Sequence, residues 1–183
     1  MATTQAPVSS TVWKIDPTHS HIEFAVKHLM ISTVKGRFDD VEGTITIAPN
    51  DPSKSSVNAT IKAASIDTRT GQRDDHLRSS DFLHAEKFPD LTFASTRITG
   101  DADDFKVTGQ LTIRGVTREI TLDATEEGSG KDPWGGERIG FSAKTKLDRR
   151  DYGLVWNQAI ETGGVVVGNE VKISIEIEAV KQG

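Results

Sequence analysis

Strict alternation of apolar and polar residues is the feature that most constrains how this chain can fold. The clearest example is the segment 171–178, "VKISIEIE", which carries an aliphatic residue at every odd position and a polar one at every even position. Successive side chains of a β-strand point to opposite faces, so this period of two indicates a half-buried strand rather than a helix. The pattern recurs along most of the chain, which predicts an all-β protein.

Eight segments are predicted to be strands on this basis. They are 20–29, 34–48, 57–62, 91–95, 105–113, 116–124, 139–147 and 171–178. Only Arg114 and Gly115 separate the fifth segment from the sixth, and such a two-residue connection predicts an antiparallel hairpin. Gly36 and Gly43 mark points where the long second segment could bend or bulge.

Eight antiparallel strands leave unpaired edges unless the sheet closes on itself. We therefore predict an eight-stranded antiparallel β-barrel, whose interior is either filled by side chains or holds one small ligand. A sandwich of two sheets is the alternative. The chain has seven Phe, three Trp and one Tyr, with no aromatic girdle at the strand ends, so we expect the apolar rows to face inward rather than toward lipid.

Other segments lack the alternation. Residues 74–88 are predicted to form a short helical segment with Asp74 or Ser80 as its N-cap and Pro89 beyond its end. The glycine-rich residues 126–137 are predicted to be a long loop. Residues 1–12 are predicted to be a flexible tail before one domain at 13–183, since a chain of 183 residues suits one core better than two.

Composition excludes several classes of function. Lys and Arg number 22 against 27 Asp and Glu, a formal charge of -5, which argues against a nucleic-acid platform. The absence of cysteine removes disulfides and thiolate metal sites. No signal-peptide pattern occurs in the chain as given, so we expect a cytoplasmic protein, or a periplasmic or secreted one if the sequence is a trimmed mature form.

Four stretches resemble a known family in the same order along the chain. They are "HSHIEFAVKHLMISTVKGRF" at 19–38, "RDDHLRSSDFLHAEKFPDLTF" at 73–93, "VTGQLTIRGVTREITL" at 107–122 and "VGNEVKISIEIEAV" at 167–180. They closely resemble the YceI-like, polyisoprenoid-binding family. The resemblance implies a lipocalin-like barrel whose lumen binds a long isoprenoid or another long-chain amphipathic lipid, with no cofactor and no established catalytic reaction. Many members carry a signal peptide, and this sequence differs in lacking one.

If the lumen is open, the inward rows supply its lining. The candidate apolar lining residues are Ile22, Phe24, Val26, Phe38, Ile45, Ile61, Phe93, Leu111, Ile113, Phe141 and Leu154. His28 ends one apolar row, and is either a polar anchor for a lipid head group or a core histidine with an internal partner. Trp156 either lines the pocket or plugs one barrel end.

The predicted helical segment supplies further candidates. Arg78 or Arg73 could meet a pyrophosphate from a helix that acts as a lid, because a planar guanidinium suits such an anion. The alternative is a solvated turn in which Arg78 pairs with Asp74.

Two other functions stay open. An enzyme or metal-binding protein would use His19, His21 and His28, although no third ligand is placed beside the His19 and His21 pair. No G-x-S-x-G motif, phosphate-binding glycine loop or cysteine nucleophile is present, which argues against an enzyme. A filled barrel would instead be an interaction protein, and a homodimer is compatible with either interior.

Overall fold

The structure is a computed structural model that describes residues 9–160 and 163–183. Eleven strands belong to one sheet. They are β1 (Thr11–Ile15), β2 (His21–His28), β3 (Ser32–Phe38), β4 (Val41–Ile47), β5 (Ser56–Lys62), β6 (Ile66–Asp67), β7 (Asp90–Gly100), β8 (Phe105–Ile113), β9 (Val116–Lys131), β10 (Glu137–Asp148) and β11 (Val167–Gln182). The α-helix α1 spans Gly71–Arg78, and single 3₁₀ turns span Pro52–Lys54, Ala63–Ser65 and Arg149–Tyr152.

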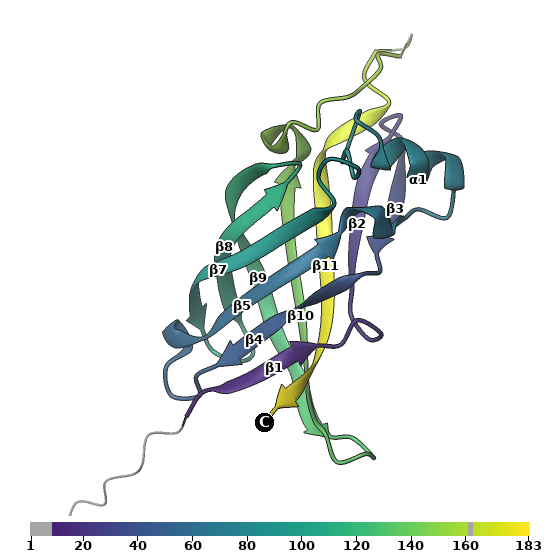
Figure 1. Cartoon of the computed structure of the whole chain (residues 1–183). Helices are drawn as coiled ribbons and strands as arrows, with labels where there is room; N and C mark the ends of the chain where they lie inside the picture. The colour runs from purple at the N-terminus through teal and green to yellow at the C-terminus, as the bar shows by residue number, and fades with distance from the viewer. Residues whose placement is uncertain (1–8, 161–162) are drawn as a thin grey trace, which may run out of the picture.

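The sheet closes into a barrel. Its strands follow the order β1-β4-β5-β7-β8-β9-β10-β11, and β11 also pairs with β1, so eight strands form a complete ring (Figure 1). Every pairing within the ring is antiparallel. The predicted eight-stranded antiparallel barrel is therefore confirmed. The remaining strands, β2, β3 and β6, extend the wall beside β11.

The long strand β11 has two successive partners on one side. Its residues 167–176 pair with β2, and residues 179–182 pair with β1. β1 and β2 therefore occupy one position in the wall, interrupted by residues 16–20. β1 begins at Thr11, so the end of the predicted N-terminal tail is already part of the sheet. Residues 1–8 lie outside the described part of the chain.

The predicted strand at 34–48 is divided into β3 and β4, which meet at Asp39 and Asp40. β3 pairs with β2 while β4 pairs with β1, so the chain bends where those two partners are themselves interrupted. The bend does not fall at Gly36 or Gly43. Partner strands rather than local composition set its position.

The helix begins and ends earlier than residues 74–88. Thr70 precedes its first residue, and Asp74 lies buried within it. The Asp74 carboxylate accepts hydrogen bonds from the backbone N–H of Thr68, at 2.8 Å, and from its hydroxyl. Asp74 therefore fixes the connection from β6 instead of capping the helix, and Ser80 lies beyond the helix end. Both predicted N-caps are wrong. Among the described residues, no helix has the length and apolarity needed to cross a bilayer.

The glycine-rich loop predicted at 126–137 is mostly strand. β9 and β10 stay paired as far as Lys131 and Glu137, and their hairpin projects beyond the barrel (Figure 1). Its turn is held by Asp132, whose Oδ1 accepts from the backbone N–H of Trp134 at 2.9 Å and of Gly136 at 2.8 Å. Glycine weakens a strand, but the partner strand here supplies the hydrogen bonds that keep it extended.

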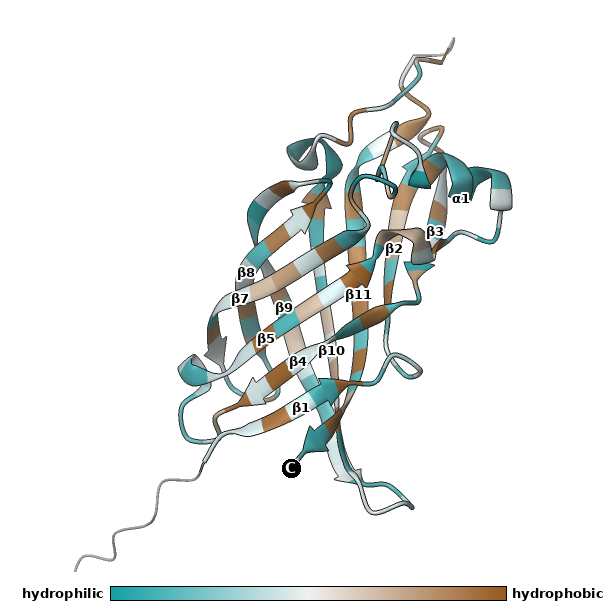
Figure 2. Cartoon of the chain, in the orientation of Figure 1, coloured by the Kyte–Doolittle hydropathy of each residue, from teal (hydrophilic) through white to brown (hydrophobic). Residues whose placement is uncertain are grey.

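The apolar rows face inward, as predicted. Along β2, Phe24 packs against the buried core whereas Glu23 and Lys27 are exposed. The same alternation of apolar and polar residues is visible along most strands in Figure 2. The turn of Arg114 and Gly115 between β8 and β9 is also confirmed, with φ values of 51° and 73° that suit a tight hairpin.

Candidate ligand-binding cavity

The barrel encloses a cavity of about 840 Å³. Its lining reaches from Trp13 and Ile139, near the projecting β9–β10 hairpin, to His76 and Trp156 at the end where α1 lies. We call these the hairpin end and the α1 end. The volume lies in the upper part of the range of about 300–1,000 Å³ that is typical of small-molecule sites. The predicted alternative of a fully packed interior is therefore wrong.

The cavity brings together all the predicted site residues except Arg78. Those that line it are Ile22, Phe24, Val26, His28, Phe38, Ile45, Ile61, Phe93, Leu111, Ile113, Phe141, Leu154 and Trp156. They come from opposite walls of the barrel, because each strand turns alternate side chains toward the axis. Their role in binding a ligand stays a prediction.

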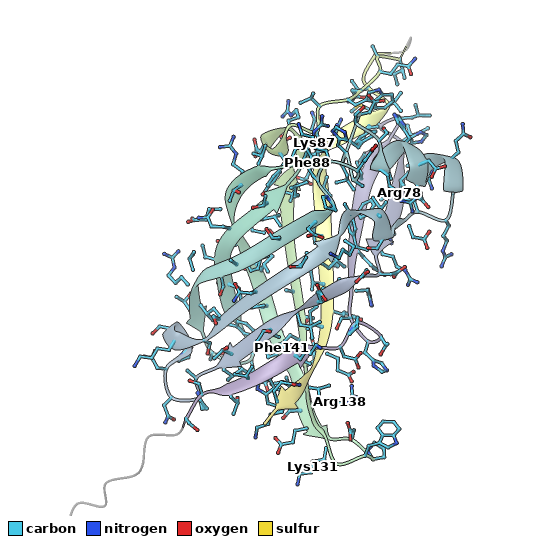
Figure 3. All side chains as sticks on the ribbon, viewed as in Figure 1. Arg78, Lys87, Phe88, Lys131, Arg138 and Phe141 are labelled. Carbon is cyan, nitrogen blue, oxygen red and sulfur yellow. The ribbon has the colours of Figure 1, made fainter. Side chains whose placement is uncertain are left out.

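Arg78 is engaged elsewhere. Its Nε donates to the carbonyl of Ala64 at 2.9 Å, and its Nη2 donates to the carbonyl of Ile66 at 3.0 Å. Its remaining ion pair is with Asp75, at 3.2 Å, and not with Asp74 as predicted, because the Asp74 carboxylate is directed to Thr68. Arg78 therefore fastens α1 to the chain before it, on the outside of the barrel (Figure 3).

His28 lies at the α1 end of β2, half-buried, and lines the cavity. Within residues 9–160 and 163–183, no hydrogen bond to its imidazole ring is found. The alternative of a core histidine satisfied by an internal partner is therefore not what the structure contains. Both ring nitrogens remain able to meet a polar group in the lumen.

Arg149 is a cavity residue that the sequence analysis did not propose. Its side chain is only 3% exposed and donates to four backbone carbonyls. These are Gly168 at 2.8 Å, Leu154 at 2.6 Å, Trp156 at 2.9 Å and Val167 at 3.3 Å. No carboxylate of the described residues lies within 4 Å of it, and burial lowers the pKa of its guanidinium. The result is a desolvated positive charge at the wall of an apolar lumen.

The adjacent Arg150 lies in a different environment from Arg149. Arg150 is exposed and forms a paired contact with Asp148, and this hydrogen bonding lowers the pKa of Asp148 to about 2. Two consecutive arginines at a strand end look alike in sequence. Only the 3₁₀ turn that begins at Arg149 directs one inward and the other to solvent.

An aromatic cluster closes part of the α1 end. The ring of Trp156 lies 4.7 Å from the ring of His76 and 5.4 Å from that of Phe82, measured between centroids. The ring of His76 in turn bonds Asp81 at 2.9 Å. Trp156 thus lines the cavity and also packs against the α1 region, which combines the two roles considered for it. Phe82 is a lining residue that alternation could not identify, because its segment is not a strand.

The hairpin end is held by Arg138. One nitrogen, Nη1, lies 2.9 Å from Asp16 and 2.7 Å from Glu178, while Nε lies 2.9 Å from Asp132. Figure 3 places Arg138 at this end, with Lys87 and Phe88 at the other. The hydrogen bonds of His19, Thr18 and Arg138 hold the pKa of Asp16 well below its usual range.

The predicted histidine group does not assemble. His19 lies in the connection between β1 and β2, and His28 lies at the opposite end of β2. Asp16, His19 and Glu178 do bring ligand atoms within 4.8 Å of one another. However, Arg138 already binds both carboxylates and neutralises their charge. This arrangement is better explained as an ion-pair network.

Comparison with known proteins identifies relatives of the whole barrel. The model of the YceI-like domain family matches residues 13–179. Protein YceI of Escherichia coli is 41% identical over 172 residues, which cover 93% of this chain and 87% of that protein. Protein YceI of Salmonella newport is 40% identical over the same length, with the same coverage.

Solved structures show the same architecture. The YceI protein of Campylobacter jejuni is 37% identical and superposes with a TM-score of 0.72, covering 86% of this chain and 90% of that one. BcnA of Burkholderia cenocepacia, at 22% identity, gives a TM-score of 0.78 and covers 90% and 98%. A domain of Saccharophagus degradans described as polyisoprenoid binding gives 0.65 at 16% identity, covering 93% and 98%.

Proposed function

Because this chain belongs to the YceI-like domain family, we propose that its barrel binds one long-chain isoprenoid or a similar amphipathic lipid. The observation that carries the proposal is the cavity of about 840 Å³, which is lined mainly by aliphatic and aromatic side chains from one barrel end to the other. The description of the structurally similar Saccharophagus degradans domain as polyisoprenoid binding supports the same ligand class.

The energetics suit an apolar tail. Each methylene moved from water into the lumen contributes about 0.8 kcal/mol, so about ten of them supply the roughly 8 kcal/mol of a micromolar complex before ordering costs are subtracted. Apolar burial of this kind depends on area and hardly distinguishes one tail from another. Tail length is limited by the cavity, and selectivity among tails of equal length falls to the head group.

We place the head group at the α1 end. Basic residues line the cavity there, namely His28, Arg73, His76 and Arg149. The acidic lining residues, Asp101 and Glu126, belong to the hairpin end, next to the β7–β8 connection. A head group rich in hydrogen-bond acceptors therefore lies beside basic side chains at one end and beside carboxylates at the other, which favours the α1 end.

Extraction and reconstitution test the proposal. Organic extracts of the purified protein should contain a long-chain lipid by mass spectrometry, and protein stripped of lipid should take up one polyprenyl alcohol per chain by native mass spectrometry. Ala143→Trp fills the lumen from β10 and should abolish uptake, whereas Ala94→Trp on the exposed face of β7 should not. A barrel that is empty on extraction and ignores added polyprenyl alcohols would contradict the proposal.

A further inference from the structure

The turn between β2 and β3 adopts a backbone conformation that its residues disfavour. Leu29 and Met30 have φ values of 50° and 63°, and the N–H of Ile31 donates to the carbonyl of His28 at 3.1 Å. Two consecutive left-handed residues define the hairpin turn in which Asn-Gly is the usual choice. Leucine and methionine are strained there because their Cβ atoms approach the backbone. Stability of the turn therefore does not explain these residues.

The same turn exposes its apolar side chains. Met30 is 62% exposed and Ile31 is 83% exposed, and we call these two residues the apolar tip. These two side chains therefore do not contribute to the apolar core of the protein. An apolar side chain kept in water, on a backbone that would suit a polar residue better, indicates contact with something outside the chain.

The apolar tip lies at the α1 end of the cavity. The N–H of Leu29 donates to the carbonyl of Val166 at 2.9 Å, and Met30 lies beside Gly164. His28 and Val166 both line the cavity. Whatever the tip contacts is therefore brought next to the end of the lumen where the head group is proposed to lie.

A band of lysines crosses the outer wall behind the tip. Lys146 on β10 is opposite Lys172 on β11, Lys172 is opposite Ala25 on β2, and Ala25 is opposite Lys35 on β3. Like charges directly opposite each other destabilise a sheet. Lys146 lies 4.0 Å from Glu170, but no ion pair among the described residues includes Lys35 or Lys172. Two positive charges of this lysine band are therefore not neutralised by an ion pair within the described residues.

We propose that the apolar tip and the lysine band dock the α1 end of the barrel onto an anionic lipid bilayer. The inference rests on the proposed function, because a lipid that passes directly between bilayer and lumen avoids exposure of its tail to water. A protein partner is less suitable, since a stable protein interface buries about 800 Å² on each side and requires shape complementarity. A bilayer accepts two apolar side chains without such complementarity, and anionic lipids attract the lysines.

Vesicle sedimentation tests the docking. Wild-type protein should bind vesicles of phosphatidylcholine and phosphatidylglycerol in equal parts, bind phosphatidylcholine vesicles much less, and lose binding as salt is added. Replacing both tip residues, by Met30→Ser with Ile31→Ser, should weaken binding by about tenfold or more, because two apolar side chains no longer leave water. Trp134→Ser is the control, since Trp134 is 84% exposed at the opposite, hairpin end and should have no effect.

A second variant separates docking from folding. Met30→Gly removes the apolar side chain and also the left-handed strain, so it should raise the melting temperature while weakening vesicle binding. A purely structural turn would not give these opposite changes. The double variant Lys35→Gln with Lys172→Gln should reduce the preference for anionic vesicles without lowering the melting temperature.

Several results would overturn the docking. They are wild-type protein that does not sediment with anionic vesicles, tip variants that bind them as wild type does, and tip variants whose main effect is to dissociate a dimer in light scattering. Uptake of a polyprenyl alcohol from solution is measured in parallel on the same variants. If the wild-type protein takes up the polyprenyl alcohol but does not bind vesicles, the docking alone is refuted. If the wild-type protein takes up no polyprenyl alcohol, the proposed function is refuted.

Discussion

At the hairpin end a guanidinium meets carboxylates, whereas at the α1 end a guanidinium meets only backbone carbonyls. Arg138 binds Asp16, Asp132 and Glu178 and so joins three separate segments by opposite charges. Arg149 is more deeply buried and has no such partner among the described residues. The first arrangement closes a barrel end by ion pairs. The second leaves a positive charge without a carboxylate partner beside the lumen, at the end where we propose that the head group lies.

Removing Arg149 should have the largest effect. Arg149→Met leaves the carbonyls of four residues without their donor in a buried setting, so we expect a loss of at least about 4 kcal/mol in the free energy of unfolding, measured in urea. Arg150→Met, on the exposed neighbour, is the control and should change stability little. Similar losses in both variants would mean that the two arginines are equivalent and that the contrast between the ends is wrong.

Replacing the tryptophans of the two ends should have different effects on stability and on ligand release. Trp13 is 7% exposed, so Trp13→Ala should destabilise the barrel by about 3 kcal/mol through the cavity it leaves. Trp156 is half-buried and packs on His76 and Phe82, so Trp156→Ala should cost less stability but release bound lipid faster. Urea unfolding and stopped-flow displacement of a fluorescent lipid separate the two effects. Equal release rates in both variants would remove the distinction between a closed end and an exchanging end.

Tyr152 offers a smaller test of the α1 end. It is 1% exposed, and its hydroxyl has no hydrogen-bond partner among the described residues. Burial raises the pKa of Tyr152 to about 12, so ionisation of this phenol opposes folding. Stability is unaffected by this ionisation below about pH 10 and is lost as the pH rises from about 10 toward 12. Tyr152→Phe should therefore stabilise the protein by about 1 kcal/mol and reduce the alkaline loss of melting temperature. If Tyr152→Phe instead destabilises the protein, the Tyr152 hydroxyl must have a hydrogen-bond partner.

The hairpin end should respond to acid instead. Hydrogen bonds from Arg138 lower the pKa of Asp132, and Arg138 also contributes to the low pKa of Asp16. A carboxyl group whose pKa is lowered by folding stabilises the fold at pH values above the ordinary pKa of about 3.9. This stabilisation is lost as the pH falls below that value. Arg138→Gln should lower the melting temperature near neutral pH, and the difference from wild type should shrink in acid. A difference that does not vary with pH would assign Arg138 a packing role only.

The same contrast explains what the sequence could predict. The inward rows follow directly from alternation, so residues such as Phe24 and Phe141 were placed on the lumen correctly. The residues that close the ends follow no such period. Arg138 and Asp16 are 122 residues apart, and only the closed ring brings them together. The burial of Arg149, likewise, depends on a 3₁₀ turn that nothing in its immediate sequence distinguishes.

The errors in the strand assignments have one cause. Local composition predicts a loop for the glycine-rich residues after Glu126 and one strand for residues 34–48. In both cases the neighbouring strand decides where pairing continues and where it stops. Pairing is a tertiary property, so local propensity is a weak guide to it.

The seam between β1 and β11 has a consequence for biosynthesis. Val12 is opposite Gln182 in that seam, so the ring can close only after residue 182 has left the ribosome. Until then the nascent chain holds an open sheet whose apolar face has no enclosed interior, and pairing over such sequence distances is slow. The enclosed lumen therefore exists only after the last strand of the ring has been made and paired.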